Sequence, residues 1–183
     1  MTVLPFDREW TVEDLDALPD DGLRYELLDG TLLVTGACTA SHQVAVGEIY
    51  LVLRAASPAD CRVMLAPYAY RPTRRRSFLP DLLVARRVDV ATKEINAPLL
   101  LAVEVLSRST RSVDLVLKRS VLYEESGVLA YWVVDPLVPS VRAWELDDGA
   151  YVERGFAQGD ETLTLDVPFP VSLTPSALLD GLT

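Results

Sequence analysis

Three short, almost continuous apolar runs constrain the fold of this chain more than any other feature. They span residues 82–85 (LLVA), 99–106 (LLLAVEVL) and 128–134 (VLAYWVV). Runs of this kind present no polar face to water, so they are typical of central strands that are covered on both sides. We therefore expect an α/β (or α+β) fold in which helices flank a mixed central β-sheet.

Two carboxylates accompany these runs. Asp81 directly precedes the first run, and Glu104 lies inside the second. An acid in such apolar surroundings is unfavourable unless a partner or a ligand neutralises it. Two acids on neighbouring strands can share a divalent cation, because hard cations prefer oxygen ligands. Ion-pair networks also bury acids of this kind, so the pattern by itself leaves both interpretations open.

Turn signals and apolar periodicity place the remaining elements. Asp29-Gly30 predicts a β-hairpin in the N-terminal part of the chain, and Asp148-Gly149 predicts another in the C-terminal part. Apolar spacing and capping residues predict the helices. The further expected elements are helices over 11–18, 41–56, 110–126 and 175–182, two mutually paired strands over 62–66 and 67–70, and a strand over 162–167.

The composition is that of a globular protein, with half of the 183 residues hydrophobic. This length fits one domain over residues 1–183. No apolar run is as long as a membrane-spanning helix, and the first residues do not form a secretory signal. We therefore expect a cytoplasmic protein without a membrane partner. Cys38 and Cys61 are isolated in the sequence, which disfavours a zinc site of the usual spacing and is typical of free thiols.

The net charge of −10 is distributed unevenly along the chain. Residues 61–120 contain twelve basic and five acidic side chains, whereas the segments before and after them contain eleven acidic side chains each. Basic residues gathered in this way can guide a nucleic-acid backbone even on an acidic protein. They can equally form surface ion pairs with the acidic segments. The candidate phosphate contacts are Arg74, Arg75, Arg76, Arg108 and Arg111.

Several other residue types have ordinary explanations. His42 is the only histidine, and we expect it to lie at the surface or to cap a helix rather than to act as a base. Lys118 follows Asp114 by one helical turn, so the spacing alone favours a surface ion pair. A hydrolase that used Ser107 or Ser109 as its nucleophile would have no evident local base.

The order of short motifs along the chain resembles a known family. It is similar to the Uma2 family, within the PD-(D/E)XK restriction-endonuclease-like superfamily, over nearly the whole chain. The resemblance implies a restriction-endonuclease-like core, a bacterial cytoplasmic protein, DNA as a partner and a homodimer. The motifs are Trp10-Thr11, Arg24-Tyr25-Glu26, Asp29-Gly30, Ser41-His42-Gln43, Pro80-Asp81, Glu104 to Arg111, Asp114, Lys118, Tyr123, Gly127-Val128, Tyr131-Trp132 and Asp135-Pro136.

The resemblance also implies roles for particular residues. Asp81 and Glu104 match the two acids of the motif and imply a Mg²⁺ or Mn²⁺ site. Glu26 matches a family acid that orients a metal-bound water. Two positions after Glu104, where the superfamily has a lysine, this chain has Leu106. Lys118 matches a lysine that Uma2-like sequences carry on the following helix, and we expect it to replace the missing one.

Two functions of different classes follow from this reading. The first is a metal-dependent DNA endonuclease, in which Asp81 and Glu104 bind the cation and Lys118 stabilises the charge of the transition state. The alternative is a catalytically inactive nuclease-like fold that binds nucleic acid or associates with another protein. Affinity for a divalent cation separates the two, because an inactive protein has no need to retain it.

Overall fold

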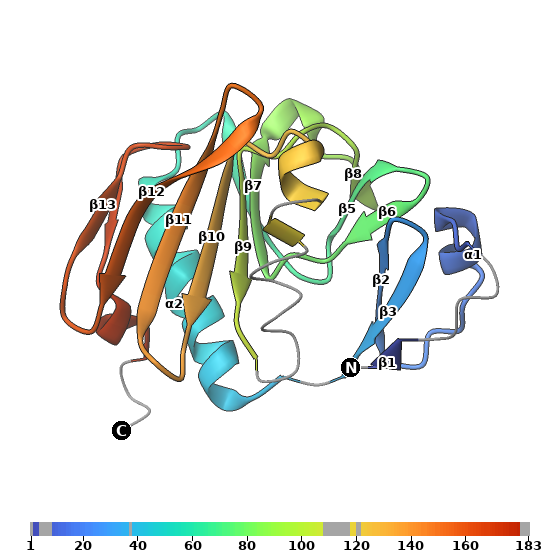
Figure 1. Ribbon diagram of the computed structural model, residues 1–183, viewed down its shortest axis with the longest axis horizontal. Helices are drawn as coiled ribbons and strands as arrows, with labels where there is room; N and C mark the ends of the chain where they lie inside the picture. The colour runs from blue at the N-terminus through green and yellow to red at the C-terminus, as the bar shows by residue number, and fades with distance from the viewer. Residues whose placement is uncertain (1, 4–8, 37, 108–117, 120–121, 180–183) are drawn as a thin grey trace.

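The apolar runs form the middle of a six-stranded sheet (Figure 1). The computed structural model describes residues 2–3, 9–36, 38–107, 118–119 and 122–179. In spatial order the sheet consists of β12 (Ala150–Gln158), β11 (Ser140–Asp147), β10 (Ala130–Asp135), β9 (Leu101–Val105), β7 (Leu82–Arg86) and β4 (Cys61–Leu65). Strands β9 and β10 are parallel, and the other neighbours are antiparallel. The mixed central sheet is therefore confirmed.

A second six-stranded sheet lies beside the first (Figure 1). In spatial order it consists of β1 (Thr2–Val3), β3 (Thr31–Thr35), β2 (Arg24–Leu28), β6 (Arg76–Phe78), β5 (Ala69–Thr73) and β8 (Glu94–Ile95). The predicted pairing of strands 62–66 and 67–70 is wrong, because β4 pairs with β7 whereas β5 pairs with β6 and β8. The short connection after Leu65 carries the chain from one sheet to the other.

Both predicted hairpins are present. Strands β2 and β3 are joined by Asp29 and Gly30, which have φ angles of +50° and +82°, and β11 and β12 are joined by Asp148 and Gly149, with +50° and +84°. Positive φ at both central residues is the geometry of a turn that follows the natural twist of two antiparallel strands. The Asp-Gly pairs therefore fix both turns locally.

The helices begin where capping residues place them. Thr11 and Asp14 form a capping box at α1 (Val12–Asp16), and Thr39 caps α2 (Ala40–Ala56). Residues 118–119 and 122–125 are helical, while the rest of the helix expected from 110 lies outside the described residues. Short 3₁₀ turns are η1 (Arg87–Asp89) and η3 (Pro175–Leu179). Within the described ranges, none of the helices combines the length and apolar character needed to cross a membrane.

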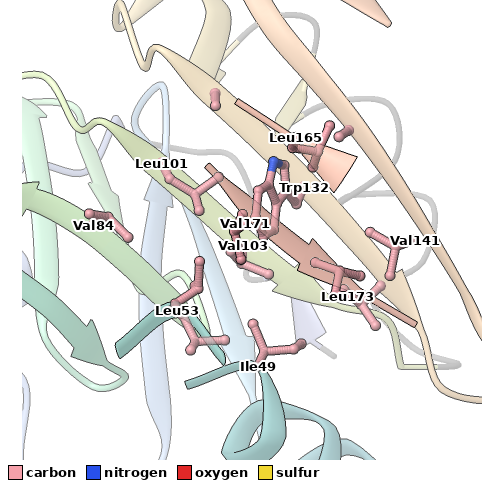
Figure 2. Packing of buried hydrophobic residues seen from close by; sticks show 14 of the residues in the cluster. Ile49, Leu53, Val84, Leu101, Val103, Trp132, Val141, Leu165, Val171 and Leu173 are labelled. Carbon is pink, nitrogen blue, oxygen red and sulfur yellow. The ribbon is translucent and has the colours of Figure 1, made fainter. Parts of the chain in front are cut away.

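One face of the central sheet is covered by α2 and the C-terminal strands. Ile49 and Leu53 of α2 pack against Val84 and Val103, while β13 (Leu163–Leu165) and β14 (Val171–Leu173) cover Trp132 (Figure 2). Successive side chains of a strand point to opposite faces. Leu83 and Ala102 accordingly belong to a separate buried cluster on the other face.

That other face is covered by the second sheet and by the helical residues after 121. Aromatic rings of these elements and of β10 form a chain of contacts, with centroid distances of 6.0 Å for Tyr70–Phe78, 5.2 Å for Phe78–Tyr123 and 5.0 Å for Tyr123–Tyr131. Glu104 is two positions after Ala102 on β9 and therefore points toward this same face. Residues from both sheets consequently meet beside Glu104.

Candidate active site

A pocket of about 270 Å³ opens where the two sheets meet the start of α2. Arg24 and Glu26 of β2 line it from the second sheet, and Leu106 and Leu137 contribute apolar surface. All four residues that we expect to be catalytic line this pocket. They are Glu26, Asp81, Glu104 and Lys118.

Asp81 is held at the start of β7 by two donors on one of its oxygens. Its Oδ2 accepts a hydrogen bond of 2.9 Å from the backbone N–H of Val105, and it lies 3.1 Å from Nε2 of His42. Its Oδ1 lies 3.5 Å from Nη1 of Arg24, which is a long contact. The carboxylate is therefore fixed through Oδ2, while Oδ1 faces the half-buried Arg24.

The surroundings of Asp81 favour its ionised form. Burial by itself would raise the pKa of this carboxyl. The hydrogen bond and charge of His42, the N–H of Val105 and the charge of Lys118 outweigh burial and hold the pKa below its usual value. Asp81 is thus an anion that is only 6% exposed, as expected of a ligand for a cation.

Lys118 connects the two other carboxylates of the pocket. Its Nζ lies 2.9 Å from Oε1 of Glu104 and 3.1 Å from Oε1 of Glu26, and its side chain is 3% exposed. Glu26 also accepts a 2.9 Å hydrogen bond from the backbone N–H of Leu79. The prediction of a surface ion pair is therefore wrong for Lys118, because the helix turns this side chain inward; Asp114 lies outside the described residues.

Tyr123 completes the surroundings of Glu104. Its hydroxyl donates a 2.7 Å hydrogen bond to the same Oε1 that Lys118 contacts. Complete burial, followed by the negative charge of Glu104, raises the pKa of Tyr123 well above its usual value, so the hydroxyl keeps its proton. No role was expected of Tyr123 from the sequence, although its place in the family motif was a signal.

His42 and Arg24 are further residues of the pocket that sequence reasoning missed. The expectation of a surface or capping histidine is wrong, because His42 is 5% exposed and contacts Asp81. A purely local pattern does not reveal this contact, since the two residues are 39 positions apart. Arg24 and His42 both occur in the motifs that carry the family resemblance, which was the available signal.

The arginine cluster of the β5–β6 turn lies elsewhere. Arg74 contacts Glu13 at 3.0 Å, and Arg75 contacts Glu9 at 2.9 Å. These arginines and Arg76 line a separate, shallow depression that also contains acidic side chains. The alternative of surface ion pairs thus describes the contacts of this cluster. Arg108 and Arg111 lie outside the described residues.

The donor set of the pocket fits a small, hard cation. Three carboxylates in it face two permanent cations, Arg24 and Lys118. Within the described ranges there is no group of three or more His, Cys, Asp or Glu side chains arranged to hold a metal. Mg²⁺ commonly uses one or two carboxylates, with waters and substrate phosphate as its other ligands. Asp81 and Glu104 meet that smaller requirement.

Comparisons with known proteins identify the family of the chain and a solved structure with a similar fold. The model of the Uma2 family, described as a putative restriction endonuclease, matches residues 12–179. The crystal structure of a putative nuclease of the DUF820 group from Anabaena variabilis superposes with a TM-score of 0.70 at 18% identity, and covers 94% of this chain and 99% of that one. No curated protein matches the chain. The structural likeness confirms the predicted nuclease-like fold.

Proposed function

The chain belongs to the Uma2 family, and from this membership together with the pocket we propose that it is a metal-dependent endonuclease. In this proposal it hydrolyses phosphodiester bonds of DNA in the bacterial cytoplasm, as a homodimer. The observation that carries the proposal is the convergence of Glu26, Asp81, Glu104 and Lys118 on one pocket. These residues come from separate elements of both sheets and a helix, so their meeting is a property of the folded chain.

Each of these residues has a part in the proposed reaction. Asp81 and Glu104 would hold Mg²⁺ or Mn²⁺. When bound, such an ion polarises a phosphate and lowers the pKa of a coordinated water. Lys118 places a positive charge beside Glu104, where it can offset the charge that develops on the phosphate. Glu26 holds the Lys118 ammonium and would help to orient the attacking water.

We propose that Lys118 replaces the lysine that the superfamily carries two positions after its second acid. Leu106, which has that place in this chain, is 4% exposed and belongs to the core beside the pocket. Lys118 reaches Glu104 from the helix instead, at 2.9 Å. The support for this role is the direct contact with Glu104 and the burial of the ammonium group.

Cleavage of plasmid DNA with Mg²⁺ or Mn²⁺ tests this function. We expect wild-type protein to nick or linearise the plasmid, and Asp81→Asn to lose this activity, because a neutral amide is a much weaker cation ligand. The matched control is Asp20→Asn, which changes an exposed acid that does not line the pocket. Equal inactivity of wild type and Asp81→Asn over a range of salt and DNA substrates contradicts the proposal.

One observation favours the alternative of an inactive fold that binds nucleic acid or another protein. Lys118 and Tyr123 both contact Oε1 of Glu104, so this acid has protein partners without any cation. Calorimetric titration with Mn²⁺ separates the two functions. If the protein is a nuclease, it binds Mn²⁺ with a measurable heat that Asp81→Asn abolishes. If it is an inactive descendant, wild type and Asp81→Asn give the same titration.

A further inference from the structure

His42 and the backbone of Val105 act together on Asp81. Both approach Oδ2, at 3.1 Å and 2.9 Å, so this single oxygen receives two contacts. The histidine is supported in turn by α2, because Thr39 caps that helix by accepting a hydrogen bond from the N–H of His42. The orientation of the Asp81 carboxylate is therefore set from two directions, and Oδ1 is turned away from both donors.

The protonation pattern of the His42 ring follows from its contacts. An ionised carboxylate only accepts hydrogen bonds, so Nε2 carries the proton that lies between His42 and Asp81. Nδ1 is buried and has no hydrogen-bond partner within the described ranges. The ring is thus arranged as a donor to Asp81.

We propose that His42 is a positioning residue: it orients Asp81 so that Oδ1 is presented to the divalent cation, and thereby sets the affinity of the pocket for that cation. The inference rests on the proposed metal-dependent function. Groups that hydrogen-bond to metal ligands fix the direction of the ligand, and their loss commonly weakens metal binding about 10- to 100-fold. The contact of Arg24 with Oδ1 of Asp81 is longer, at 3.5 Å, and holds that oxygen less firmly than His42 and Val105 hold Oδ2.

Two substitutions of His42 separate hydrogen bonding from packing. His42→Leu fills a similar volume without a donor, whereas His42→Gln retains an N–H at about the position of Nε2. Calorimetric titration with Mn²⁺ measures affinity for the cation without any need for cleavage. We expect His42→Leu to bind Mn²⁺ about 10- to 100-fold more weakly than wild type, and His42→Gln to stay close to wild type. Thermal melts establish that both variants are folded.

The outcomes distinguish this inference from the function on which it rests. Absence of Mn²⁺ binding by wild type overturns both. Binding by wild type and equally tight binding by His42→Leu overturns only the role of His42, and so does an equal loss in both variants, because glutamine keeps the donor. Since His42 is the only histidine, ¹⁵N-histidine labelling yields a single ring spectrum. We expect a slowly exchanging Nε2 proton; a rapidly exchanging ring overturns the contact even if Mn²⁺ binds.

Discussion

Lys118 links two carboxylates that belong to different sheets. Glu104 lies on β9 and Glu26 on β2, and the ammonium group contacts both. Removal of one partner from a buried ion pair leaves uncompensated charge and costs about 3–5 kcal/mol. We therefore expect Lys118→Met to lower the free energy of unfolding of the metal-free protein by about 3–5 kcal/mol, measured by urea denaturation.

The chain offers a matched control for this prediction. Lys93 is the other lysine and is exposed, so Lys93→Met should leave the urea midpoint unchanged. Equal midpoints for Lys118→Met and Lys93→Met contradict the buried network. A lower stability of Lys118→Met that Mn²⁺ partly restores agrees with it, since a cation can replace the lost positive charge.

The individual residues of the pocket were predictable to different degrees. Asp81 and Glu104 stand out in the sequence, because an acid beside an apolar run demands a partner. Their partners cannot be recognised in this way, because they are distant in sequence. Lys118 is 92 positions from Glu26, and His42 is 39 positions from Asp81. Spacing along a helix describes only local neighbours. The catalytic role of Lys118 was therefore predicted from the family resemblance alone, and His42 was wrongly expected at the surface or as a helix cap.

The two Asp-Gly hairpins give a matched pair of glycines. A Cβ at Gly30 would lie 3.3 Å from Nε of Arg75 and 3.4 Å from the carbonyl oxygen of Trp10, whereas a Cβ at Gly149 would meet nothing within 4 Å. Both have positive φ, which costs about 1–2 kcal/mol for other residues. We expect Gly149→Ala to destabilise by about that amount, and Gly30→Ala to destabilise more.

Chemical denaturation of the two variants measures this difference. The larger effect at Gly30 has a structural cause, because Trp10 donates its backbone N–H to the carbonyl of Gly30 at 2.9 Å, and Gly30 donates to the carbonyl of Arg75 at 2.9 Å. An alanine there would crowd the Arg75 side chain, which also donates a 2.9 Å hydrogen bond to the carbonyl of Asp29 in the same turn. Equal losses of stability in Gly30→Ala and Gly149→Ala contradict the proposed crowding.

Local signals explain which elements were predicted. The turns, helices α1 and α2 and the three central strands depend on residues that are close in sequence, and the structure confirms them. Strand pairing does not depend on nearby residues alone. Neighbouring strands 62–66 and 67–70 had the pattern of a pair, yet burial on two separate sheets outweighed their proximity. Short edge strands such as β1 and β8 have too few residues for a periodic signal.

Charge is paired across the molecule between segments of opposite sign. Arginines of the middle third contact acids of the N-terminal segment, including Arg71 with Asp16 at 2.7 Å and Arg74 with Glu13 at 3.0 Å. A backbone hydrogen bond joins the same two segments, because Val12 donates its N–H to the carbonyl of Arg74 at 2.9 Å. The uneven charge along the sequence therefore reflects attachment of α1 to the second sheet, in addition to any role in binding DNA.

The exposed arginines of the β5–β6 turn remain accessible to a DNA phosphate, and this contact can be tested. The Arg74 side chain is 76% exposed and that of Glu13 58%, and pairs of this kind are weak enough to exchange a partner. If Arg74 contacts a phosphate, Arg74→Gln lowers the slope of log affinity against log salt by about 0.9. We expect this decrease. Fluorescence anisotropy with labelled duplex DNA in EDTA measures it without cleavage.

Arg142→Gln is the matched control for that measurement. Arg142 is 40% exposed and pairs with Glu153 at 2.7 Å on the C-terminal hairpin, which does not line the carboxylate pocket. Both substitutions change the net charge of −10 equally, so a general electrostatic effect alters the two salt slopes alike. A smaller slope in Arg74→Gln alone indicates a local phosphate contact. Identical slopes contradict it and leave attachment of α1 as the role of Arg74.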